Sequence, residues 1–294
     1  MSRKYIVRMQ AGLANRMFQY TYWLYLQKKG YDVYVDNSFK TSKWKIDEVY
    51  WEEIFPNAKL REATKWLVFR YGCGYDLTSY IRRHYLKRTS FTINMGNPYR
   101  LPSEYEMERY RAFIGLFANI EVVKYVDKDI RKRFKFTEFN DKRNISLKNS
   151  MMAENSVAVH LRKGKDYLVN EAFSGTCSVD YYRKAIDYIY RNVKNPVFYV
   201  FTDNPEWLKE NMKGFDYNLI DWNPAIGRGN HYDLQLMSCC KHNIISNSTY
   251  SWWAAYLNNN ANKIVIEPKV WYNPQVRDDL NLNNGLLCQD WIAI

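Results

Sequence analysis

Two polar loops of this sequence carry side chains suited to binding an anion. Residues 162–166 (R-K-G-K-D) follow an apolar run and present three cations beside Asp166. An arginine can hold a phosphate through two parallel hydrogen bonds, which makes Arg162 a candidate phosphate ligand. Residues 246–249 (S-N-S-T) supply hydroxyls, an amide and the free N–H groups of an expected helix start, which also attract anions.

Each loop also has a simpler explanation. Residues 162–166 are equally suited to an exposed charged loop, and Ser248 or Thr249 can serve only as the N-cap of the helix that follows. The two loops are expected on adjacent strands of one sheet, and this placement favours a phosphate site over two unrelated surface loops.

Strands and helices alternate in the second half of the chain. The expected strands are residues 157–161, 197–201, 243–245 and 263–266, with the last closing the sheet. This pattern predicts a doubly wound, Rossmann-like α/β domain that binds ligands at the carboxyl ends of its strands. A third polar loop, residues 202–204, stands at such an end, and Asp203 or Asn204 is expected to cap the next helix.

The chain also opens with a strand, a loop, a helix and a second strand. Residues 4–9 and 31–36 are the expected strands, and the helix between them places Leu13, Met17, Tyr20 and Leu24 on one face. Residues 40–150 show no clear periodicity. The polar stretch 140–155 is the best candidate boundary, giving one domain at 1–150 and a second at 151–294.

Composition narrows the class of protein. The chain has 294 residues, a net charge of +12 and 47% hydrophobic residues, typical of a globular protein. No apolar run is long enough to span a membrane, and the first residues lack the apolar core of a signal peptide, so we expect a cytoplasmic location. Aromatic residues reach 17%, which suits both a large core and stacking against sugar rings.

The excess of positive charge lies mainly in the first half. Basic pairs at 82–83 and 87–88 are interleaved with Tyr80, Tyr85 and Leu86, which predicts weak, salt-sensitive contact with a membrane surface at most. No nucleic-acid-binding motif accompanies this charge, so no nucleic acid is expected as a partner. The oligomeric state is left open.

Common cofactor motifs are absent from the sequence. Neither G-x-G-x-x-G nor G-x-x-x-x-G-K-[ST] occurs, and the histidines and cysteines show no zinc-site spacing. Residues 127–129 (D-K-D) resemble the acidic triplet that holds a metal-bound nucleotide sugar in some glycosyltransferases. They lie in a strongly basic, helix-like run, so we interpret them as surface charge and expect no metal and no cofactor.

Five motifs, in order, resemble those of bacterial α-1,2-fucosyltransferases. Residues 12–20 (G-L-A-N-R-M-F-Q-Y) are similar to an N-terminal signature of that family, and 160–167 (H-L-R-K-G-K-D-Y) to its H-x-R-R-G-D-Y loop. The further matches are 201–207, 233–253 and 266–271. The resemblance covers both ends of the chain and misses residues 40–150.

This resemblance implies a GT-B-like fold of two Rossmann-type domains facing across a cleft. It implies metal-independent, inverting transfer of L-fucose from GDP-fucose to the 2-hydroxyl of a terminal galactose on a glycan. The C-terminal domain would hold the donor, and the N-terminal domain would lie on the acceptor side. The implied catalytic residues are Arg162, Asn15 and Asp166. The implied donor-binding residues are Gly12, Arg16, His160, Lys163, Asp203, Asn247, Ser248, Thr249 and Ser251.

Three positions depart from the family pattern. Ala14 stands where Gly is usual, and Arg16, where Gln is common, would add positive charge facing the diphosphate. Lys165 is an apparent insertion that shifts Asp166 by one residue, so the role of Arg162 transfers directly and that of Asp166 does not. A general base for the acceptor hydroxyl is not singled out. Its candidates are Glu171, Asp166, Asp36 and His160.

Other functions remain open at this level. The same donor could serve another acceptor or linkage, because acceptor choice would depend on the middle of the chain. The inserted Lys165 would suit an inactive glycan- or nucleotide-binding protein. The charge of +12 alone would suit a basic protein that binds nucleic acid or membranes.

Overall fold

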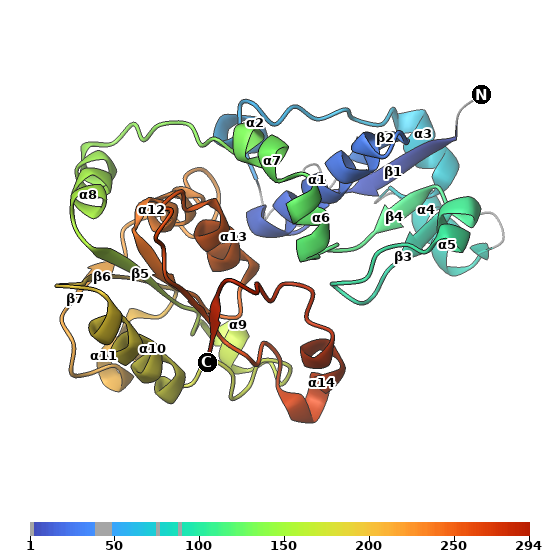
Figure 1. Cartoon of the computed structure of the whole chain (residues 1–294). Helices are drawn as coiled ribbons and strands as arrows, with labels where there is room; N and C mark the ends of the chain where they lie inside the picture. Colours follow the sequence, from blue (N-terminus) through green and yellow to red (C-terminus); the bar gives the residue numbers. More distant parts are fainter. Residues whose placement is uncertain (1–2, 39–48, 75–76, 88–89) are drawn as a thin grey trace. The chain divides into compact units, whose positions relative to one another are not determined.

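The computed structural model describes residues 3–38, 49–74, 77–87 and 90–294. The chain forms two compact units, unit 1 from Met1 to Thr137 and unit 2 from Glu138 to Ile294 (Figure 1). The expected boundary at 150 falls instead inside α8 (Lys142–Ala153) of unit 2. Asn144 of this helix donates a hydrogen bond to Asn223 Oδ1 at 2.8 Å, which ties the polar stretch to unit 2.

Unit 1 contains a parallel sheet with the strand order β2-β1-β4-β3. The strands are β1 (Lys4–Arg8), β2 (Asp32–Asp36), β3 (Thr92–Asn94) and β4 (Ala112–Ile114). The first two lie where the sequence predicts them. Because β2 and β4 lie on opposite sides of β1, the strand order reverses beside β1, and loops that leave β1 and β4 diverge there.

Helix α1 (Leu13–Lys28) is buried more completely than its sequence pattern indicates. The four residues expected on one face are all buried, and so are Arg16, Gln19 and Thr21 between them. The Tyr20 ring packs against rings outside the sheet. They are Trp23, Trp51 and Phe134, with centroids 5.1 to 5.4 Å away. Such burial on several sides hides the one-faced periodicity of a surface helix.

The stretch without periodicity consists of short elements. Its helices are α2 (Trp51–Ile54), α3 (Lys65–Tyr71), α4 (Leu77–His84), α5 (Glu104–Arg109), α6 (Ile120–Tyr125) and α7 (Asp127–Arg133). Helices of four to eight residues complete at most about two turns, too few to repeat an apolar pattern. Capping side chains start three of them, for example the reciprocal Ser103–Glu106 pair of α5.

Unit 2 contains a six-stranded parallel sheet with the order β10-β9-β8-β5-β6-β7. Its strands are β5 (Ser156–Leu161), β6 (Val197–Thr202), β7 (Tyr217–Ile220), β8 (His242–Ile244), β9 (Val265–Glu267) and β10 (Ile292–Ala293). The prediction that the strand at 263–266 closes the sheet is wrong, because β10 pairs outside β9. β7 and β10 were missed, since both are short and only partly buried.

Helices cover both faces of this sheet. Figure 1 shows α10 (Val179–Asn192) and α11 (Pro205–Asn211) on one face, and α12 (Tyr232–Cys239) and α13 (Thr249–Leu257) on the other. The buried residues of α10 pack against Val157, Val159, Phe198 and Val200. The sheet is therefore sandwiched between two helical layers, as expected for a Rossmann-type domain. In the described residues, no helix combines the length and apolarity needed to cross a bilayer.

Candidate functional site

The loops after β5 and β8 meet at the point where the strand order of unit 2 reverses. β5 pairs with β8 on one side and with β6 on the other, so its carboxyl end is the topological switch point. There, His160 Nδ1 lies 2.8 Å from Ser246 Oγ. This hydrogen bond joins the end of β5, two residues before Arg162, to the loop that leads into α13. The pairing of β5 with β8 confirms that the two polar loops follow adjacent strands.

His160 is held in its neutral form at this junction. Burial and the positive charge of Arg162 lower the pKa of the imidazole to about 3. A neutral imidazole adds no charge to an anion site, and a pKa of about 3 makes it a poor general base at neutral pH. Its contribution is the hydrogen bond to Ser246, and its ring lies 6.0 Å from that of Tyr250.

The Lys163 ammonium points into unit 2. Its side chain is buried, and Nζ lies 3.3 Å from the Thr176 carbonyl and over the rings of Tyr167 and Trp207. Burial lowers the pKa of this amine. The backbone N–H of Lys163 donates to Asp203 Oδ1 at 2.6 Å. Lys163 and Asp203 therefore brace the loop, and their contact with a donor stays a prediction.

The loop after β6 is fastened to the same segment. Asn204 Nδ2 donates to the Lys163 carbonyl at 2.8 Å, and Asn204 Oδ1 accepts from the N–H of Trp207 at 3.1 Å. Asn204 is thus the N-cap of α11, one of the two residues expected for that role. All three polar loops are connected, with the half-buried Arg162 between them.

Asn247 makes a full set of contacts inside unit 2. Its Oδ1 accepts from the Tyr167 hydroxyl at 2.7 Å and from the Cys177 thiol at 3.3 Å. Its Nδ2 donates to Thr176 Oγ1 at 3.1 Å and to the Trp271 carbonyl at 2.6 Å. The side-chain amide has two donor hydrogens and one acceptor oxygen, so its usual bonding capacity is taken up within the protein.

The remaining hydroxyls of this loop have different positions. Ser248 caps α13 by accepting from the N–H of Tyr250 at 3.3 Å, which is the simpler of the two roles considered for it. Ser251 is fully buried, with Oγ 3.5 Å from Ser246 Oγ. Thr249 opens α13 and is half-buried. Helix capping thus accounts for Ser248, and donor contacts of all three residues remain predictions.

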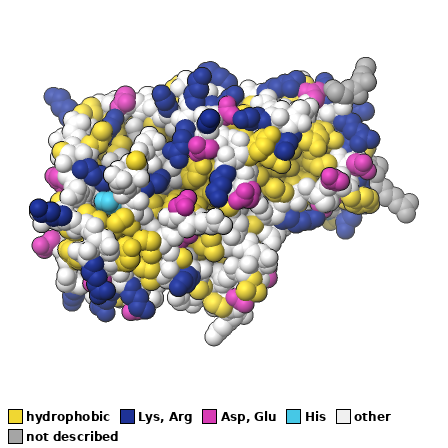
Figure 2. Space-filling model, in the orientation of Figure 1, with side chains coloured by type: hydrophobic (Ala, Val, Ile, Leu, Met, Phe, Trp, Pro, Cys, Tyr) yellow, Lys and Arg dark blue, Asp and Glu magenta, His cyan; other side chains and the backbone are white. Residues whose placement is uncertain are grey.

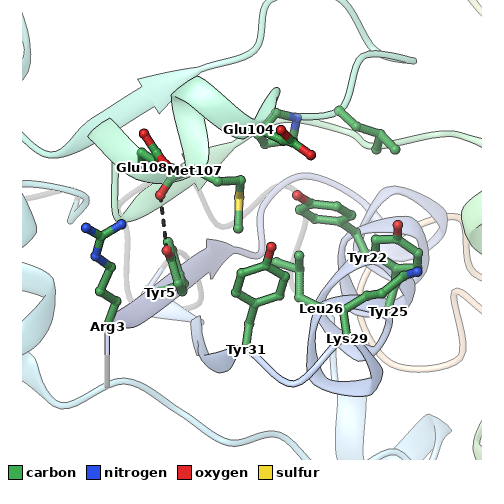
Figure 3. Close-up of a pocket in the computed structure, with 12 residues that line it drawn as sticks. Arg3, Tyr5, Tyr22, Tyr25, Leu26, Lys29, Tyr31, Glu104, Met107 and Glu108 are labelled. Atoms are coloured by element: carbon green, nitrogen blue, oxygen red, sulfur yellow. Dashed lines mark hydrogen bonds between the residues drawn. The ribbon is translucent and has the colours of Figure 1, made fainter. Parts of the chain in front are cut away.

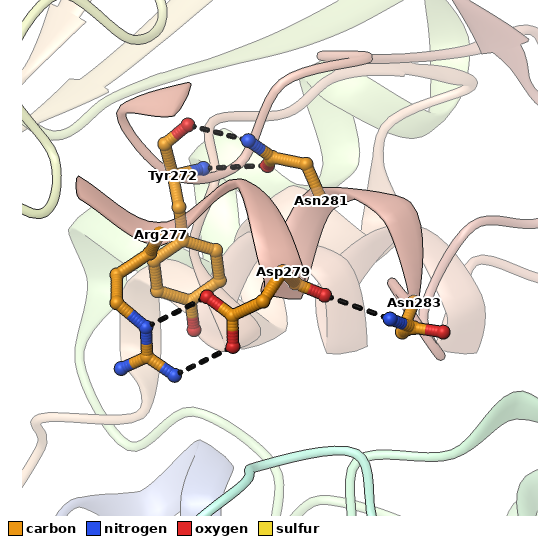
Figure 4. Close-up of polar contacts among 5 residues, drawn as sticks. All are labelled: Tyr272, Arg277, Asp279, Asn281 and Asn283. Atoms are coloured by element: carbon orange, nitrogen blue, oxygen red, sulfur yellow. Dashed lines mark hydrogen bonds and ion pairs between the residues drawn. The ribbon is translucent and has the colours of Figure 1, made fainter. Parts of the chain in front are cut away.

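A short C-terminal segment supports the Asn247 contact. Asn281 of α14 (Pro274–Leu282) accepts from the N–H of Trp271 at 3.0 Å. It also accepts from the N–H of Tyr272 at 2.9 Å and donates to the Tyr272 carbonyl at 2.8 Å (Figure 4). In the same view, Arg277 and Asp279 form a two-bond ion pair. The amide of Asn281 thereby fixes the backbone whose Trp271 carbonyl receives Asn247 Nδ2. Sequence reasoning missed Asn281.

In unit 1, the loop after β1 is held by side chains of α1. Arg16 is buried, and its Nε donates to the Ala11 carbonyl at 2.8 Å; Ala11 has a φ of 63°. Gln19 Oε1 accepts from the N–H of Gln10 at 2.8 Å. Gly12 is the N-cap residue of α1 and has no side chain to cap it. The structure gives Arg16 a bracing role in unit 1, and its expected contact with a diphosphate stays a prediction.

A hollow of about 200 Å³ opens at this edge of unit 1. Asn15 lines it, together with Asn94 at the end of β3, Asn97 in the loop after β3 and Gly115 in the loop after β4. Amide side chains both donate and accept, so this lining suits the hydroxyl groups of a sugar. The resemblance singled out Asn15 as a catalytic residue, and that role stays a prediction. The other three had no signal in the sequence, because they lie in the stretch without periodicity.

A larger hollow of about 580 Å³ lies at the opposite, amino end of β1 (Figure 3). Four tyrosines line it together with four charged residues. The tyrosines are Tyr5, Tyr22, Tyr25 and Tyr31, and the charged residues are Arg3, Lys29, Glu104 and Glu108. The Tyr5 hydroxyl donates to the Met107 carbonyl at 3.1 Å. The rings and carboxylates form a polar aromatic hollow, but it lies away from the carboxyl edge where this fold binds ligands.

The other base candidates are dispersed. Asp36 is buried at the end of β2, where burial raises the pKa of its carboxyl. Asp166 lies in α9 (Lys165–Leu168), and its side chain is outside the described part of the structure. The inserted Lys165 is the exposed first residue of that helix. Glu171 is exposed. No candidate is thereby singled out.

Both aspartates of the acidic triplet 127–129 form ion pairs. Asp127 Oδ1 lies 2.9 Å from Arg131 Nε, and Asp129 Oδ2 lies 2.7 Å from Lys28 Nζ. Across the residues that the structure describes, no three His, Cys, Asp or Glu side chains are grouped so as to hold a metal ion.

Three relatives share the sequence to different extents. An α-1,2-colitosyltransferase of Escherichia coli is 30% identical over 94% of both chains. The O-antigen biosynthesis glycosyltransferase WbnK of Escherichia coli is 38% identical over 45% of this chain and 44% of its own length. Galactoside α-(1,2)-fucosyltransferase 1 of Leontocebus fuscicollis is 32% identical over 34% of this chain and 28% of its own.

A solved structure and a family profile complete the comparison. NodZ α-1,6-fucosyltransferase, soaked with GDP-fucose, aligns over 87% of this chain and 93% of its own, with 14% identity and a TM-score of 0.49. The profile of glycosyl transferase family 11 matches residues 84–294, which is well over half of the chain. The α/β class and the two Rossmann-type domains predicted from the sequence are confirmed by two units that each hold a parallel sheet. The family predicted from the five motifs is confirmed as well: this chain belongs to glycosyl transferase family 11.

Proposed function

We propose that the chain is a galactoside α-1,2-fucosyltransferase. It transfers L-fucose from GDP-fucose to the 2-hydroxyl of a terminal galactose on a glycan, inverts the anomeric centre and needs no metal. One observation carries the donor site: the 2.8 Å contact of His160 with Ser246, which brings the Arg162 loop and the start of α13 together at the switch point. We further propose a cytoplasmic location.

The chemistry requires stabilisation of the leaving diphosphate. As the C1–O bond of GDP-fucose breaks, positive charge grows on the sugar ring and negative charge on GDP. Arg162 supplies a permanent cation, and the N–H groups at the start of α13 supply further donors. Fixed groups of this kind, aimed at the growing negative charge, are usually the largest source of rate enhancement.

The bracing residues keep these groups in place. Asn204, Asp203 and Asn247 fix the backbone of the three loops through hydrogen bonds within unit 2. A preorganised site does not have to reorient when the bond breaks, so this rigidity supports catalysis. In unit 1, we assign Asn15 and Gly12 to contacts with the sugar, because both stand at the amide-lined hollow or the loop beside it.

A second donor deserves a direct test. The relative that aligns over 94% of both chains is named for colitose, a sugar that lacks the 3-hydroxyl of fucose. If this chain used GDP-colitose, the leaving group would still be GDP and the linkage formed would still be α-1,2. A site that hydrogen-bonds the 3-hydroxyl discriminates strongly against the deoxy sugar, whereas a site that ignores it does not.

The test is transfer to lactose in the presence of EDTA, with GDP-fucose and GDP-colitose as separate donors. We expect a fucosylated product whose α-1,2 linkage is identified by NMR. Product from GDP-colitose alone would reassign the donor. Binding of GDP without product from either donor would leave a nucleotide-binding protein or a different acceptor, and absence of both binding and transfer would overturn the proposal.

A further inference from the structure

Helix α4 exposes its apolar face. Leu77 lies three residues before Tyr80 and four before Ile81, and Tyr85, one residue beyond the helix, lies four after Ile81, which is the spacing of one helical face. These four residues are 71%, 46%, 38% and 74% exposed, respectively. The one residue that α4 buries is the polar Ser79. An amphipathic helix on a globular protein normally turns its apolar face inward, so the orientation of α4 is reversed.

The arginines of α4 explain this orientation. Arg82 donates to the Phe69 and Arg70 carbonyls of α3 at 2.8 and 3.2 Å. Arg83 donates to the Gly72 and Gly74 carbonyls at 2.7 and 2.6 Å. These bonds give hydrogen-bond partners to backbone carbonyl groups at the carboxyl end of α3 and just after it. They also hold the basic side of α4 against α3. The apolar side of α4 is thereby directed to solvent.

Helix α3 extends the same kind of surface. Trp66 and Phe69 are 62% and 46% exposed, and each carries an arginine over its ring, Arg70 at 5.1 Å and Arg82 at 4.6 Å. Leu86, which follows α4, is 52% exposed. We call this the α3–α4 patch: Trp66, Phe69, Leu77, Tyr80, Ile81, Tyr85 and Leu86.

The described residues of the segment that forms the patch carry charge of one sign. Among the described residues from 65 to 87, no side chain is acidic, whereas five are Lys or Arg: Lys65, Arg70, Arg82, Arg83 and Lys87. The single acidic residue of this stretch in the sequence is Asp76, which lies outside the described residues. The face of the molecule seen in Figure 2 carries both basic and acidic side chains.

We propose that the α3–α4 patch docks onto an anionic lipid membrane. Exposed Trp, Tyr and Leu side chains beside Lys and Arg are the composition of helices that lie in the membrane interface, where rings enter the boundary region and cations meet lipid phosphates. A second copy of the chain is a poorer occupant, because it would place five cations against the same five cations. The patch goes beyond the transferase site and does not depend on it.

The experiment is flotation of the purified full chain with vesicles. We expect the protein to float with vesicles containing 30% phosphatidylglycerol and to remain unbound with pure phosphatidylcholine, with binding reduced by high salt. Leu77→Ser combined with Tyr85→Ser should lower the bound fraction about tenfold or more, since both side chains are largely exposed apolar groups. The matched control is Val169→Ser with Leu282→Ser, two residues of similar exposure in unit 2.

Folding and catalysis are checked on the same samples. Unchanged thermal unfolding and unchanged transfer to soluble lactose in Leu77→Ser/Tyr85→Ser would separate docking from the proposed function. Equal flotation of parent, patch variant and control would overturn the proposal. So would absence of binding to phosphatidylglycerol, or loss of a dimer in the patch variant without loss of flotation, which would assign the patch to a second copy.

Discussion

The two units place different chemistry at the same topological position. Each has a parallel sheet whose strand order reverses beside a central strand, β1 in unit 1 and β5 in unit 2. At β1 there is a hollow of about 200 Å³ lined by amides and glycines, with no Lys or Arg among its lining residues. At β5 the loops carry Arg162 and are joined by hydrogen bonds.

This difference separates two tasks. An open, amide-lined hollow suits a neutral ligand with many hydroxyls, whereas a braced loop with a permanent cation suits a diphosphate. Asn247, Lys163 and Asp203 of the unit 2 motifs make hydrogen bonds inside unit 2. We therefore expect the proposed anion to contact fewer groups than the motifs contain.

The largest expected effect comes from removing the cation of unit 2. Arg162→Ala should lower kcat/KM for GDP-fucose by about 100- to 1000-fold, because the leaving diphosphate loses a fixed positive partner. The measurement is steady-state transfer to lactose, with GDP affinity determined by calorimetry. Arg191→Ala is the matched control, since Arg191 lies exposed near the end of α10, which leads to the amino edge of the sheet. Equal activity of both variants would contradict the assignment of the diphosphate to β5.

Asn247→Ala tests whether the second loop is scaffold. The substitution leaves the Trp271 carbonyl without its side-chain partner and removes one of the two partners of the Tyr167 hydroxyl, which keeps Thr176 Oγ1. We expect the free energy of unfolding to fall by about 2–3 kcal/mol. Urea unfolding measures it. Asn283→Ala is the control, because Asn283 is exposed and makes a single bond to the Asp279 carbonyl (Figure 4). Full stability with a raised KM for GDP-fucose would instead make Asn247 a donor ligand.

A buried acid at the carboxyl edge of unit 2 gives a pH dependence. Glu267, at the end of β9, is buried; its Oε1 accepts from the N–H of Cys288 at 3.1 Å, and burial raises its pKa to about 8. Between pH 4.5 and 8 the folded protein keeps this proton while the unfolded chain releases it. The free energy of unfolding should therefore fall as pH rises through this window, by up to about 1.4 kcal/mol per pH unit.

Glu267→Gln removes this slope, because its amide does not ionise. The measurement is urea unfolding at several pH values from 5 to 9. Glu206→Gln, at an exposed position in α11, should retain the slope of the parent. An identical pH dependence in Glu267→Gln and the parent would show that Glu267 does not titrate in the folded protein as its burial implies.

The sequence predicted the framework of unit 2 because its signals are local. Apolar runs such as 157–161 and 197–201 form strands almost as expected, and Ser178, Asn204 and Ser248 cap helices through contacts three or fewer residues away. The adjacency of the loops at 162 and 246 followed from the parallel pattern. These features depend on neighbours in the chain, which a sequence displays directly.

The roles of site residues depend on distant partners and could not be predicted in the same way. The sequence indicates a surface cation at Lys163, whereas in the structure its ammonium lies among the Thr176 carbonyl and two aromatic rings. The sequence suggests that Arg16 directs its charge at the diphosphate of the donor, whereas in the structure its Nε donates a hydrogen bond to the Ala11 carbonyl. Asn94, Asn97 and Gly115 line the hollow of unit 1, but they lie in a stretch of short elements without periodicity, so the sequence pattern did not predict them.

Glycine substitutions in unit 1 separate the needs of the fold from those of a ligand. Gly12 has an ordinary φ of −66°, and a Cβ added there would meet no atom within 4 Å. Gly115→Ala is the contrast, because its Cβ would lie 2.9 Å from Met95 Cγ and from the Phe117 ring. We expect Gly115→Ala to lower the free energy of unfolding by about 1–3 kcal/mol.

Gly12→Ala should change the free energy of unfolding by about 0.5 kcal/mol or less, the smallest effect on the fold considered. If the sugar of the donor approaches this loop, the added methyl group occupies space that the ligand needs, and kcat/KM should fall about tenfold, equivalent to about 1.4 kcal/mol. Thermal unfolding and the transfer assay are measured together. Parental activity in Gly12→Ala would place the sugar away from the loop after β1 and leave Asn15 as the remaining contact to test there. A lower free energy of unfolding in Gly12→Ala would instead mean that other atoms of the protein occupy the space beside Gly12.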